Sequence, residues 1–354
     1  MFSNYKGSRM KLSLLVAVLS MFIACKKISL PLLKDGGFAD QPTVLIVGKE
    51  FNGTNNVAKA WTDGKEIDLS DGTNDASANS VAISDNDAYV AGNDAGPVFW
   101  KNGVENHLPS NSPYTVTNSM LVSGNRVLIC GTDQFDNNGS SWNRAVYWDN
   151  GVETNLGATD SGSTANAITL SNNDVYVAGI HGFNAVYWKN GTINYLTHDN
   201  IQVSHVWHVN AIAVLNGNVY EIGWINAAGS VFPQEAFWTN GVFTHFNLPA
   251  TSWGILNSIS TSGNSIFIAG MTDTSTAKLY YLAAYWKDGQ QFLLPTSAKN
   301  SYATSICVKG NDVYVAGYEF NDNGAKYAVY WKNGVEVKLT DGSRDAYAYA
   351  ITVR

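Results

Sequence analysis

The chain has 354 residues, which at roughly 100–200 residues per domain allows two or three ordinary domains or one large repetitive one. Its 32 glycines, 12% aromatic residues and only 14% charged residues describe a turn-rich globular chain and exclude a disordered or collagenous one. Lys and Arg total 22 against 29 Asp and Glu, a net charge of −7 at pH 7, so we expect no nucleic-acid partner.

The N-terminal residues 1–24 have the order of charges and apolar side chains found in a signal peptide. Three cations and no acid precede Leu12, and the run from Leu12 to Ala24 (LSLLVAVLSMFIA) is uncharged and apolar. This run has 13 residues, fewer than the roughly 20 that cross a bilayer as a helix. We therefore expect an exported chain without a permanent transmembrane helix.

The four residues Phe22-Ile23-Ala24-Cys25 resemble a bacterial lipobox, with Phe22 where leucine is usual. The resemblance implies a lipoprotein acylated at Cys25, with a short linker over residues 25–41, held in the cell envelope by its acyl chains. Lys26 and Lys27 stand where an acidic residue would signal inner-membrane retention, so the outer membrane is expected, on its periplasmic or its surface side. The alternative is an ordinary signal peptide and a chance cysteine.

The other two cysteines, Cys130 and Cys307, lie in the apolar runs VLICG and TSICV and not in CxxC or histidine-bearing clusters. We expect both to be buried as small hydrophobic side chains on different repeats, without a disulfide between them.

An internal repeat governs the rest of the chain. Seven tryptophans recur at intervals of 39, 48, 40, 50, 48 and 45 residues: Trp61, Trp100, Trp148, Trp188, Trp238, Trp286 and Trp331. Each is followed by Asn-Gly or Asp-Gly, which accept the positive φ angles of a type I′ hairpin turn. A second hairpin precedes each tryptophan, as in residues 168–179 (ITLSNNDVYVAG). Each repeat of about 45 residues thus predicts four short strands, the blade of a β-propeller rather than the coil of a solenoid.

The two ends of the repeat region predict how the ring closes. Thr43–Gly48 (TVLIVG) matches the second strand of a repeat, and Ala348–Arg354 (AYAITVR) matches the first. We predict an all-β chain, a seven-bladed β-propeller of four-stranded antiparallel blades over residues 42–354, in which residues 348–354 complete the N-terminal blade. The repeats resemble those of secreted and surface lipoproteins of the β-propeller superfamily, of the VYWKNG and NDVYVAG types. The seven tryptophans are predicted to pack blade against blade.

If the strands of a blade are labelled A to D, the B–C and D–A loops share one face, and their lengths vary along this sequence. Binding residues concentrate on variable loops of a rigid scaffold, so this loop face is the predicted functional face. Tryptophans outside the repeat positions fall there, joined by histidines around blade 5. Indoles with polar neighbours suit a carbohydrate, because a sugar stacks its C–H face on the ring. The alternative is that these tryptophans anchor their own loops. The candidate ligand-binding residues are Trp207, Trp224, Trp253, His205, His208 and Trp142.

Other polar patterns are interpreted as structural. The oxygen-rich loops 50–53, 134–139 and 319–324 lack an EF-hand spacing, so we expect turns and no cofactor, with Ca²⁺ as the alternative. His205 and His208 have a zinc-compatible spacing but no third ligand, so no metal site is expected. One residue of each first strand would form a polar ring near a mouth of the central channel, bonding the backbone or, alternatively, holding water or an ion: Asn79, Asn118, Asn166, Asn210, Asn257, Thr304 and Tyr349.

The loop face also carries the acids that a glycan hydrolase or lyase would need, namely Glu50, Asp133, Asp136, Asp199, Glu319 and Asp322. The sequence contains no GxSxG, HExxH or phosphate-binding glycine loop, and no repeat carries a singular polar motif. We therefore expect a non-enzymatic envelope lipoprotein that binds a glycan or a protein partner on its loop face, as a monomer that touches the membrane through its lipid anchor only. The alternatives are a carbohydrate-active hydrolase or lyase and a purely structural envelope component.

Overall fold

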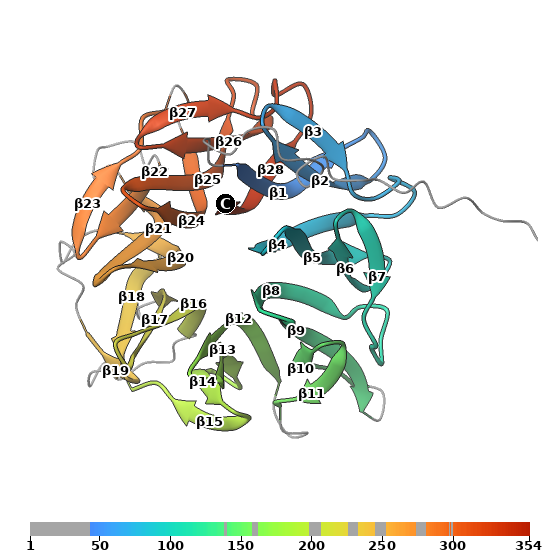
Figure 1. Ribbon diagram of the computed structural model, residues 1–354, viewed down its shortest axis with the longest axis vertical. Helices are drawn as coiled ribbons and strands as arrows, with labels where there is room; N and C mark the ends of the chain where they lie inside the picture. The colour runs from blue at the N-terminus through green and yellow to red at the C-terminus, as the bar shows by residue number, and fades with distance from the viewer. Residues whose placement is uncertain are drawn as a thin grey trace, which may run out of the picture.

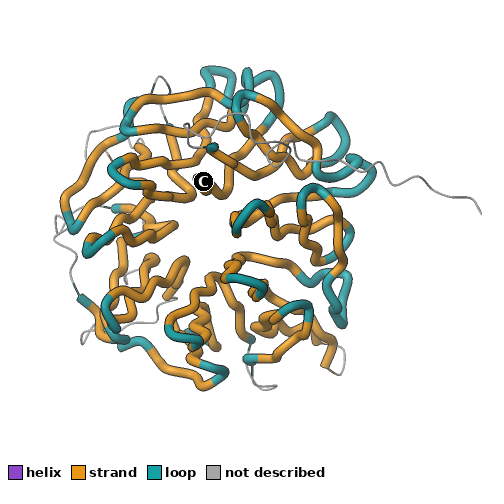
Figure 2. Tube along the Cα trace, in the orientation of Figure 1, coloured by secondary structure: helices purple, strands orange, loops and turns teal. Residues whose placement is uncertain are grey.

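The computed structural model describes residues 43–137, 140–157, 162–197, 207–225, 233–244, 253–273, 281–296, 298 and 300–354. Within these ranges the chain forms 28 β-strands and no helix, as the tube in Figure 2 shows. The strands make seven four-stranded sheets, in which every neighbouring pair is antiparallel. The predicted signal peptide and Cys25 lie outside the described residues.

The strands of the first four blades are, from A to D: in blade 1, β28 (Ala346–Val353), β1 (Val44–Phe51), β2 (Asn56–Thr62) and β3 (Lys65–Asp68); in blade 2, β4 (Ala76–Ser84), β5 (Asp87–Asp94), β6 (Pro97–Lys101) and β7 (Val104–His107); in blade 3, β8 (Val116–Ser123), β9 (Arg126–Asn137), β10 (Ser140–Asp149) and β11 (Val152–Asn155); and in blade 4, β12 (Ser163–Ser171), β13 (Asp174–His181), β14 (Asn184–Lys189) and β15 (Thr192–Tyr195).

The strands of the last three blades are, in the same order: in blade 5, β16 (Trp207–Leu215), β17 (Asn218–Ile225), β18 (Gln234–Thr239) and β19 (Val242–Phe243); in blade 6, β20 (Gly254–Ser262), β21 (Ser265–Asp273), β22 (Tyr281–Lys287) and β23 (Gln290–Leu293); and in blade 7, β24 (Ser301–Lys309), β25 (Asp312–Phe320), β26 (Lys326–Lys332) and β27 (Val335–Lys338).

The seven sheets form a closed ring around a central axis. The A strands are innermost, each lying beside the A strand of the next blade, and β28 lies between β24 and β4 (Figure 1). The chain is therefore a seven-bladed β-propeller, which confirms the predicted fold.

The ring closes where the sequence predicted. Strand β28, from the C-terminus, pairs with β1 from Val44↔Val353 to Glu50↔Ala346, so blade 1 takes strands from both ends of the chain. The neighbouring blade 7 also bonds to β28: the Thr304 hydroxyl donates to the Ala348 carbonyl at 2.7 Å. Pairing along a whole strand removes two open sheet edges at once.

The seven repeat tryptophans are at most 2% exposed and pack each blade against the preceding one. Trp188 of blade 4, for example, lies in one cluster with Leu128, Cys130 and Ala145 of blade 3. The predicted blade-to-blade packing is confirmed. Cys130 is buried and Cys307 half-buried, and both are free thiols.

A β-bulge recurs in every A strand and forms the predicted polar ring. The A–B register shifts at the ring residue, as at Asn166 between Ala165 and Ala167. The Asn166 amide donates to the carbonyl of Val209, the residue before the next ring member, at 2.8 Å. Five of the six other ring residues do the same at 2.7–2.8 Å, so the backbone interpretation of the ring is confirmed. The ring thus joins neighbouring blades.

Each bulge requires a glycine opposite it on strand B. A Cβ atom at these glycines would lie 1.8–2.2 Å from a carbonyl oxygen of strand A, closer than real atoms approach. This contact explains the recurrent glycine that ends the NDVYVAG pattern: Gly48, Gly92, Gly131, Gly179, Gly223, Gly270 and Gly317.

Two further features follow from strand pairing. Strands β9 and β10 extend into the oxygen-rich segment 134–139 that was expected to be a loop, because pairs such as Trp142↔Phe135 and Ser140↔Asn137 continue the ladder. In the part of the chain that the structure describes, no helix is long and apolar enough to cross a membrane.

Candidate functional site

The loop face holds the predicted tryptophans, and their burial differs. Trp207 begins β16, is 4% exposed, and meets the rings of Trp238 and Phe243 edge-on at centroid distances of 6.0 Å. It belongs to the core between blades 4 and 5. So little exposed surface favours the packing interpretation for this residue.

His208 and Trp224 form the pair that the structure does bring together. Their rings stack at a centroid distance of 3.8 Å and an angle of 12°, at cross-strand positions of β16 and β17. Both side chains are half-buried, and burial lowers the pKa of His208, which favours the neutral imidazole at pH 7. A neutral imidazole stacked on an indole combines an aromatic surface with a nitrogen that can accept or donate a hydrogen bond.

The remaining predicted site residues are more scattered. Trp253 is half-buried and bridges to Gln234 at the start of β18, so it lies beside blade 5. Trp142 is 38% exposed in blade 3, two blades away from His208. His205 lies outside the described residues.

A larger aromatic group, which the sequence analysis did not identify, spans blades 7 and 1. We call it the tyrosine array, and its members are Tyr302, Tyr318, Phe320, Tyr347 and Tyr349. Tyr302 and Tyr318 stack at 4.9 Å and 9°, and Tyr318 meets Tyr347 edge-on at 4.9 Å. All five side chains are half-buried. The array therefore forms one continuous aromatic surface that crosses from one blade to the next.

The array and the His208–Trp224 pair occupy equivalent places in their blades. Each blade has one cross-strand pair next to the bulge, on its loop side. Its first member lies on strand A, two residues before the bulge residue, and its second member lies on strand B, directly after the recurrent glycine. We call these two residues the loop-side pair. The pair is aromatic in blades 5 and 7 and half aromatic in blade 1, whereas blades 2, 3, 4 and 6 place small polar or aliphatic side chains there. The seven pairs are His208–Trp224, Tyr302–Tyr318, Tyr347–Lys49, Ser77–Asn93, Val116–Thr132, Thr164–Ile180 and Ile255–Met271.

Two lysines border the tyrosine array. The Lys49 ammonium lies 5.3 Å from the ring centroid of Tyr347 and 5.9 Å from that of Tyr349. Lys326 lies 5.2 Å from Phe320 and is ion-paired with Asp345 at 3.1 Å. Both contacts are within the range of a cation–π attraction.

Three of the candidate acids, Glu50, Asp133 and Glu319, lie in a module that four neighbouring blades repeat. In blades 7, 1, 2 and 3 the second residue after the strand-B glycine is acidic, and a glutamate of strand D and a basic side chain lie beside it. In blade 3, for example, Arg144 bonds Asp133 and lies 3.8 Å from Glu153. The acid, the basic side chain and the glutamate are Glu319, Lys338 and Glu336; Glu50, Lys59 and Glu66; Asp94, His107 and Glu105; and Asp133, Arg144 and Glu153.

This repetition bears on catalysis. Burial raises the pKa of Glu50, Asp94 and Glu319, as an acid catalyst would need, but it does so in several blades alike. A catalytic centre needs one singular set of groups, whereas equivalent copies in successive blades are expected of a structural tie. Asp199 lies outside the described residues, and the side chain of Asp136 is not described.

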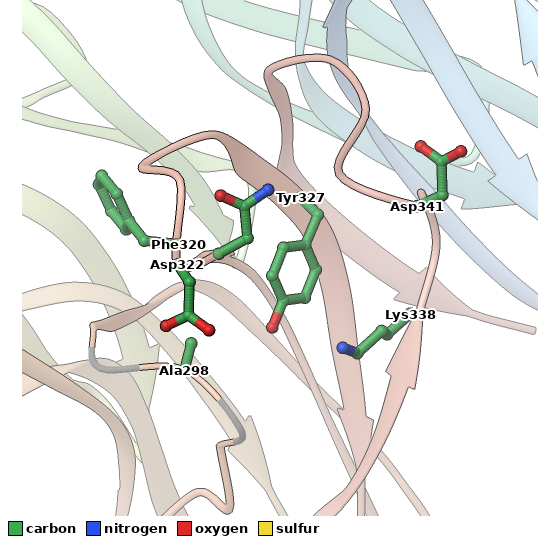
Figure 3. Close-up of a pocket in the computed structure, with 7 residues that line it drawn as sticks. Ala298, Phe320, Asp322, Tyr327, Lys338 and Asp341 are labelled. Atoms are coloured by element: carbon green, nitrogen blue, oxygen red, sulfur yellow. The ribbon is translucent and has the colours of Figure 1, made fainter.

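A small polar cavity of about 220 Å³ opens beside blade 7 (Figure 3). It is lined by Tyr327, Lys338, Asp322 and Asp341, while the ring of Phe320 is directed away from Tyr327. The Tyr327 hydroxyl donates to the buried Glu319 at 2.5 Å. The volume of this cavity is below the roughly 300–1,000 Å³ of pockets that enclose a small-molecule ligand.

The oxygen-rich loops use their oxygens to build turns. The Asn321 side-chain oxygen accepts from the amides of Asn323 and Ala325 at 3.0 Å, and that of Asn52 accepts from Asn55 at 2.9 Å. Among the described residues no three His, Cys, Asp or Glu side chains are grouped as metal ligands.

No family model matches this sequence, and no curated protein matches it. Among solved structures, the chain is similar to an acylaminoacyl peptidase of Pyrococcus horikoshii, with a TM-score of 0.50 and 11% identity over 87% of this chain and 52% of that one. The β-propeller domain of the Trilobed protease from Pyrococcus furiosus is similar over 86% of this chain and 98% of the domain, with a TM-score of 0.48 and 11% identity. An α-L-arabinofuranosidase from Clostridium thermocellum gives a TM-score of 0.33 and 13% identity, over 68% of this chain and 96% of that one.

The likeness is one of fold alone. The chain spans about half the length of the peptidases that it matches, and the identities of 10–13% carry nothing about activity.

Proposed function

We propose that this protein is a non-enzymatic binding propeller whose loop face binds a glycan. The observation that carries the proposal is the uneven distribution of aromatic side chains over the loop-side pairs. Both members are aromatic in blades 5 and 7, one member is aromatic in blade 1, and neither is aromatic in the other four blades. Packing between like blades would place similar residues at all seven positions. Aromatic residues at this position in only some of the blades are what selection for a ligand would produce.

Glycan is favoured over a protein partner because the aromatic surface is half-buried and polar at its edges. A sugar stacks its C–H face on such rings and hydrogen-bonds through its hydroxyls, whereas protein hot spots need larger, fully desolvated anchors. Catalysis is the second candidate, and the acids of the loop face are what favours it. Their repetition in four blades counts against it.

The test is a glycan array with the chain from residue 26 onward, which retains the complete ring, measured with and without Ca²⁺. We expect reproducible hits that substitution of an aromatic loop-side residue weakens, either Trp224→Ala in blade 5 or Tyr302→Leu in blade 7, and hits that require Ca²⁺ would place a cation in the site. The matched control is Trp142→Ala, which removes an exposed tryptophan two blades away from Trp224. A correctly folded ring that binds no glycan would overturn the proposal and direct the search to envelope proteins.

We further propose that the protein is an outer-membrane lipoprotein acylated at Cys25. The support is the sequence of residues 1–27 alone. Growth with an alkyne fatty acid should label the full-length chain and should not label Cys25→Ser. Label that persists in the Cys25→Ser variant would contradict acylation at this residue.

A further inference from the structure

The tyrosine array has the partial exposure expected of a ligand-binding surface. Each of its rings is neither buried nor fully exposed, so each packs on the protein with one part and keeps another part accessible. The hydroxyls of Tyr302, Tyr318 and Tyr349 bond to no described side chain or backbone group, and none of them is sealed from solvent. Half-buried phenols with solvent-facing hydroxyls suit a ligand that is apolar on one face and rich in hydroxyls at its edge.

Lys49 supplies the charge that distinguishes this surface from a neutral sugar platform. It pairs with Tyr347 across the β1–β28 ladder and lies over two rings of the array. It makes no ion pair within the described ranges, whereas the nearby Lys59 binds three carboxylates and Lys326 binds Asp345. Asp75 is near enough for the Lys49 charge to help lower the pKa of its carboxyl, but the lowering comes first from the Asn56 backbone amide, which donates to an Asp75 oxygen.

An ammonium that lies over an aromatic surface without a paired carboxylate favours an anionic group at that edge. The tyrosine rings hold the Lys49 ammonium in place through the cation–π attraction, but they leave the N–H donors of the ammonium unused. A carboxylate or sulfate on the ligand would satisfy these donors with charge-assisted hydrogen bonds while its sugar ring stacks on the tyrosines.

We propose that the tyrosine array and Lys49 bind an acidic sugar, a pyranoside that carries a carboxylate or sulfate group. This inference rests on the proposed glycan-binding function and adds the place of the site and the charge of the ligand. Tyr302 and Tyr318 stack the ring, and Lys49 receives the anion. Because the whole protein carries a net charge of −7, the positive edge selects acidic ligands at short range and does not attract them over distance.

The experiment takes each oligosaccharide that binds on the glycan array and measures two dissociation constants. One Kd is for the form that carries the carboxylate or sulfate, and the other is for the same oligosaccharide without it. The wild-type chain should bind the acidic form about tenfold or more tightly, and this preference should shrink as NaCl is raised. In Lys49→Met the preference should disappear, while the Kd for the neutral form stays within about twofold. Comparing the carboxylated with the sulfated form of one oligosaccharide tells which anion the site prefers.

Two further variants keep the test independent of folding. Tyr302→Leu retains the bulk of the side chain and should weaken both forms alike, because it removes only the stacking surface. Lys101→Met is the matched control, since Lys101 also lies over a ring, 5.1 Å from that of Tyr89, but at the opposite face beside a C–D turn. It should leave every Kd unchanged. Melting temperatures of all variants report whether the ring is intact.

The outcomes separate the two proposals. Equal binding of neutral and acidic forms, unaffected by Lys49→Met, overturns the acidic-sugar site and leaves glycan binding by the loop face standing. Loss of binding in Trp224→Ala but not in Tyr302→Leu moves the site to blade 5 and also overturns this inference. An absence of binding to any glycan overturns both.

Discussion

At the scale of single residues, Glu221 is the side chain that most clearly departs from its surroundings. It occupies the position two before the strand-B glycine, which the other blades fill with valine or isoleucine: Ile46, Val90, Ile129, Val177, Ile268 and Val315. It is fully buried, and neither carboxylate oxygen has a hydrogen-bond partner among the described residues. Burial raises its pKa from 4.5 to about 8. The folded protein therefore holds this group protonated at neutral pH.

The raised pKa of Glu221 predicts a loss of stability with rising pH. Below pH 4.5 the Glu221 carboxyl is protonated in both the folded and the unfolded protein, so its titration does not change the free energy of unfolding. Between pH 4.5 and 8 only the unfolded chain releases the proton. At 1.36 kcal/mol per pKa unit this favours unfolding by roughly 3 kcal/mol at pH 7. Glu221→Gln and Glu221→Val remove the titration. We expect their melting temperatures to rise relative to wild type from pH 5 to pH 8; curves that stay parallel over this range would refute the assignment.

Trp207 gives a second prediction at this scale, because its burial separates it from the other candidate tryptophans. Trp207→Ala should lower the free energy of unfolding by about 3–5 kcal/mol, as expected for a large ring removed from a core. Trp224→Ala removes a half-buried ring and should cost much less. Denaturant unfolding of the two variants decides between them. A small loss for Trp207→Ala would return this residue to the candidate binding surface.

At the scale of elements, the pairing of a bulge with a glycine is the feature that every blade needs. In blade 4 the added Cβ of Gly179→Ala would lie 1.9 Å from the carbonyl oxygen of Thr164. Backbone cannot move aside as a flexible side chain would, so the A and B strands must separate locally. We expect a loss of at least about 2 kcal/mol in the free energy of unfolding.

The matched control is Gly162→Ala, also in blade 4. Its added Cβ would meet a single atom, the Asn143 carbonyl oxygen, at 4.0 Å, and its backbone is not in the left-handed region. Chemical denaturation should find this variant within about 0.5 kcal/mol of wild type. Equal losses for both variants would mean that the bulge contact is not the cause.

The elements were predictable from the sequence because their signals are local. Asn-Gly and Asp-Gly turns adopt positive φ, as at Asp63 with 48° and Gly64 with 71°, and the tryptophan spacing marks each blade once. The tyrosine array was missed because it joins β24 and β25 of blade 7 to β28, which reaches them only when the ring closes. The signal was nevertheless present. Tyr318 and Trp224 both follow the recurrent glycine, and aligning that one position across the repeats would have revealed them.

The site could be predicted less well than the fold for a related reason. The sequence shows that an acid such as Glu50 or Asp133 lies near a loop, but not that each belongs to a carboxylate–cation group shared with a distant strand D. Nor does it show burial, which separates Trp207 from Trp224 although both appeared equal beside blade 5. Contacts between strands, rather than residue type, assign these roles.

At the scale of the whole molecule, stability depends on closure, because each blade packs only on its two neighbours. Blades 7 and 2 meet through blade 1, whose innermost strand arrives from the other end of the chain. The bulge ring adds six hydrogen bonds between blades, one of which ends on Ala348 of β28. The ring can therefore fold cooperatively only when β28 has paired with β1.

Removal of residues 346–354 tests this dependence. Without β28, strand β1 presents an unpaired edge, Thr304 loses the carbonyl of Ala348, and the apolar cluster around Ile46 and Tyr314 loses Ile351 and opens to water. An exposed edge beside apolar side chains favours pairing with another chain. The truncated chain should therefore aggregate or unfold without a sharp transition in size-exclusion chromatography and thermal circular dichroism. Removal of Arg354 alone, which ends one backbone hydrogen bond to Thr43 and one side-chain hydrogen bond to Asn86, should change little. Adding the peptide 346–354 in trans should restore part of the unfolding transition, because it supplies the missing strand and nothing else. A truncated chain that stays monomeric with an unchanged melting temperature would show that the ring is stable without β28.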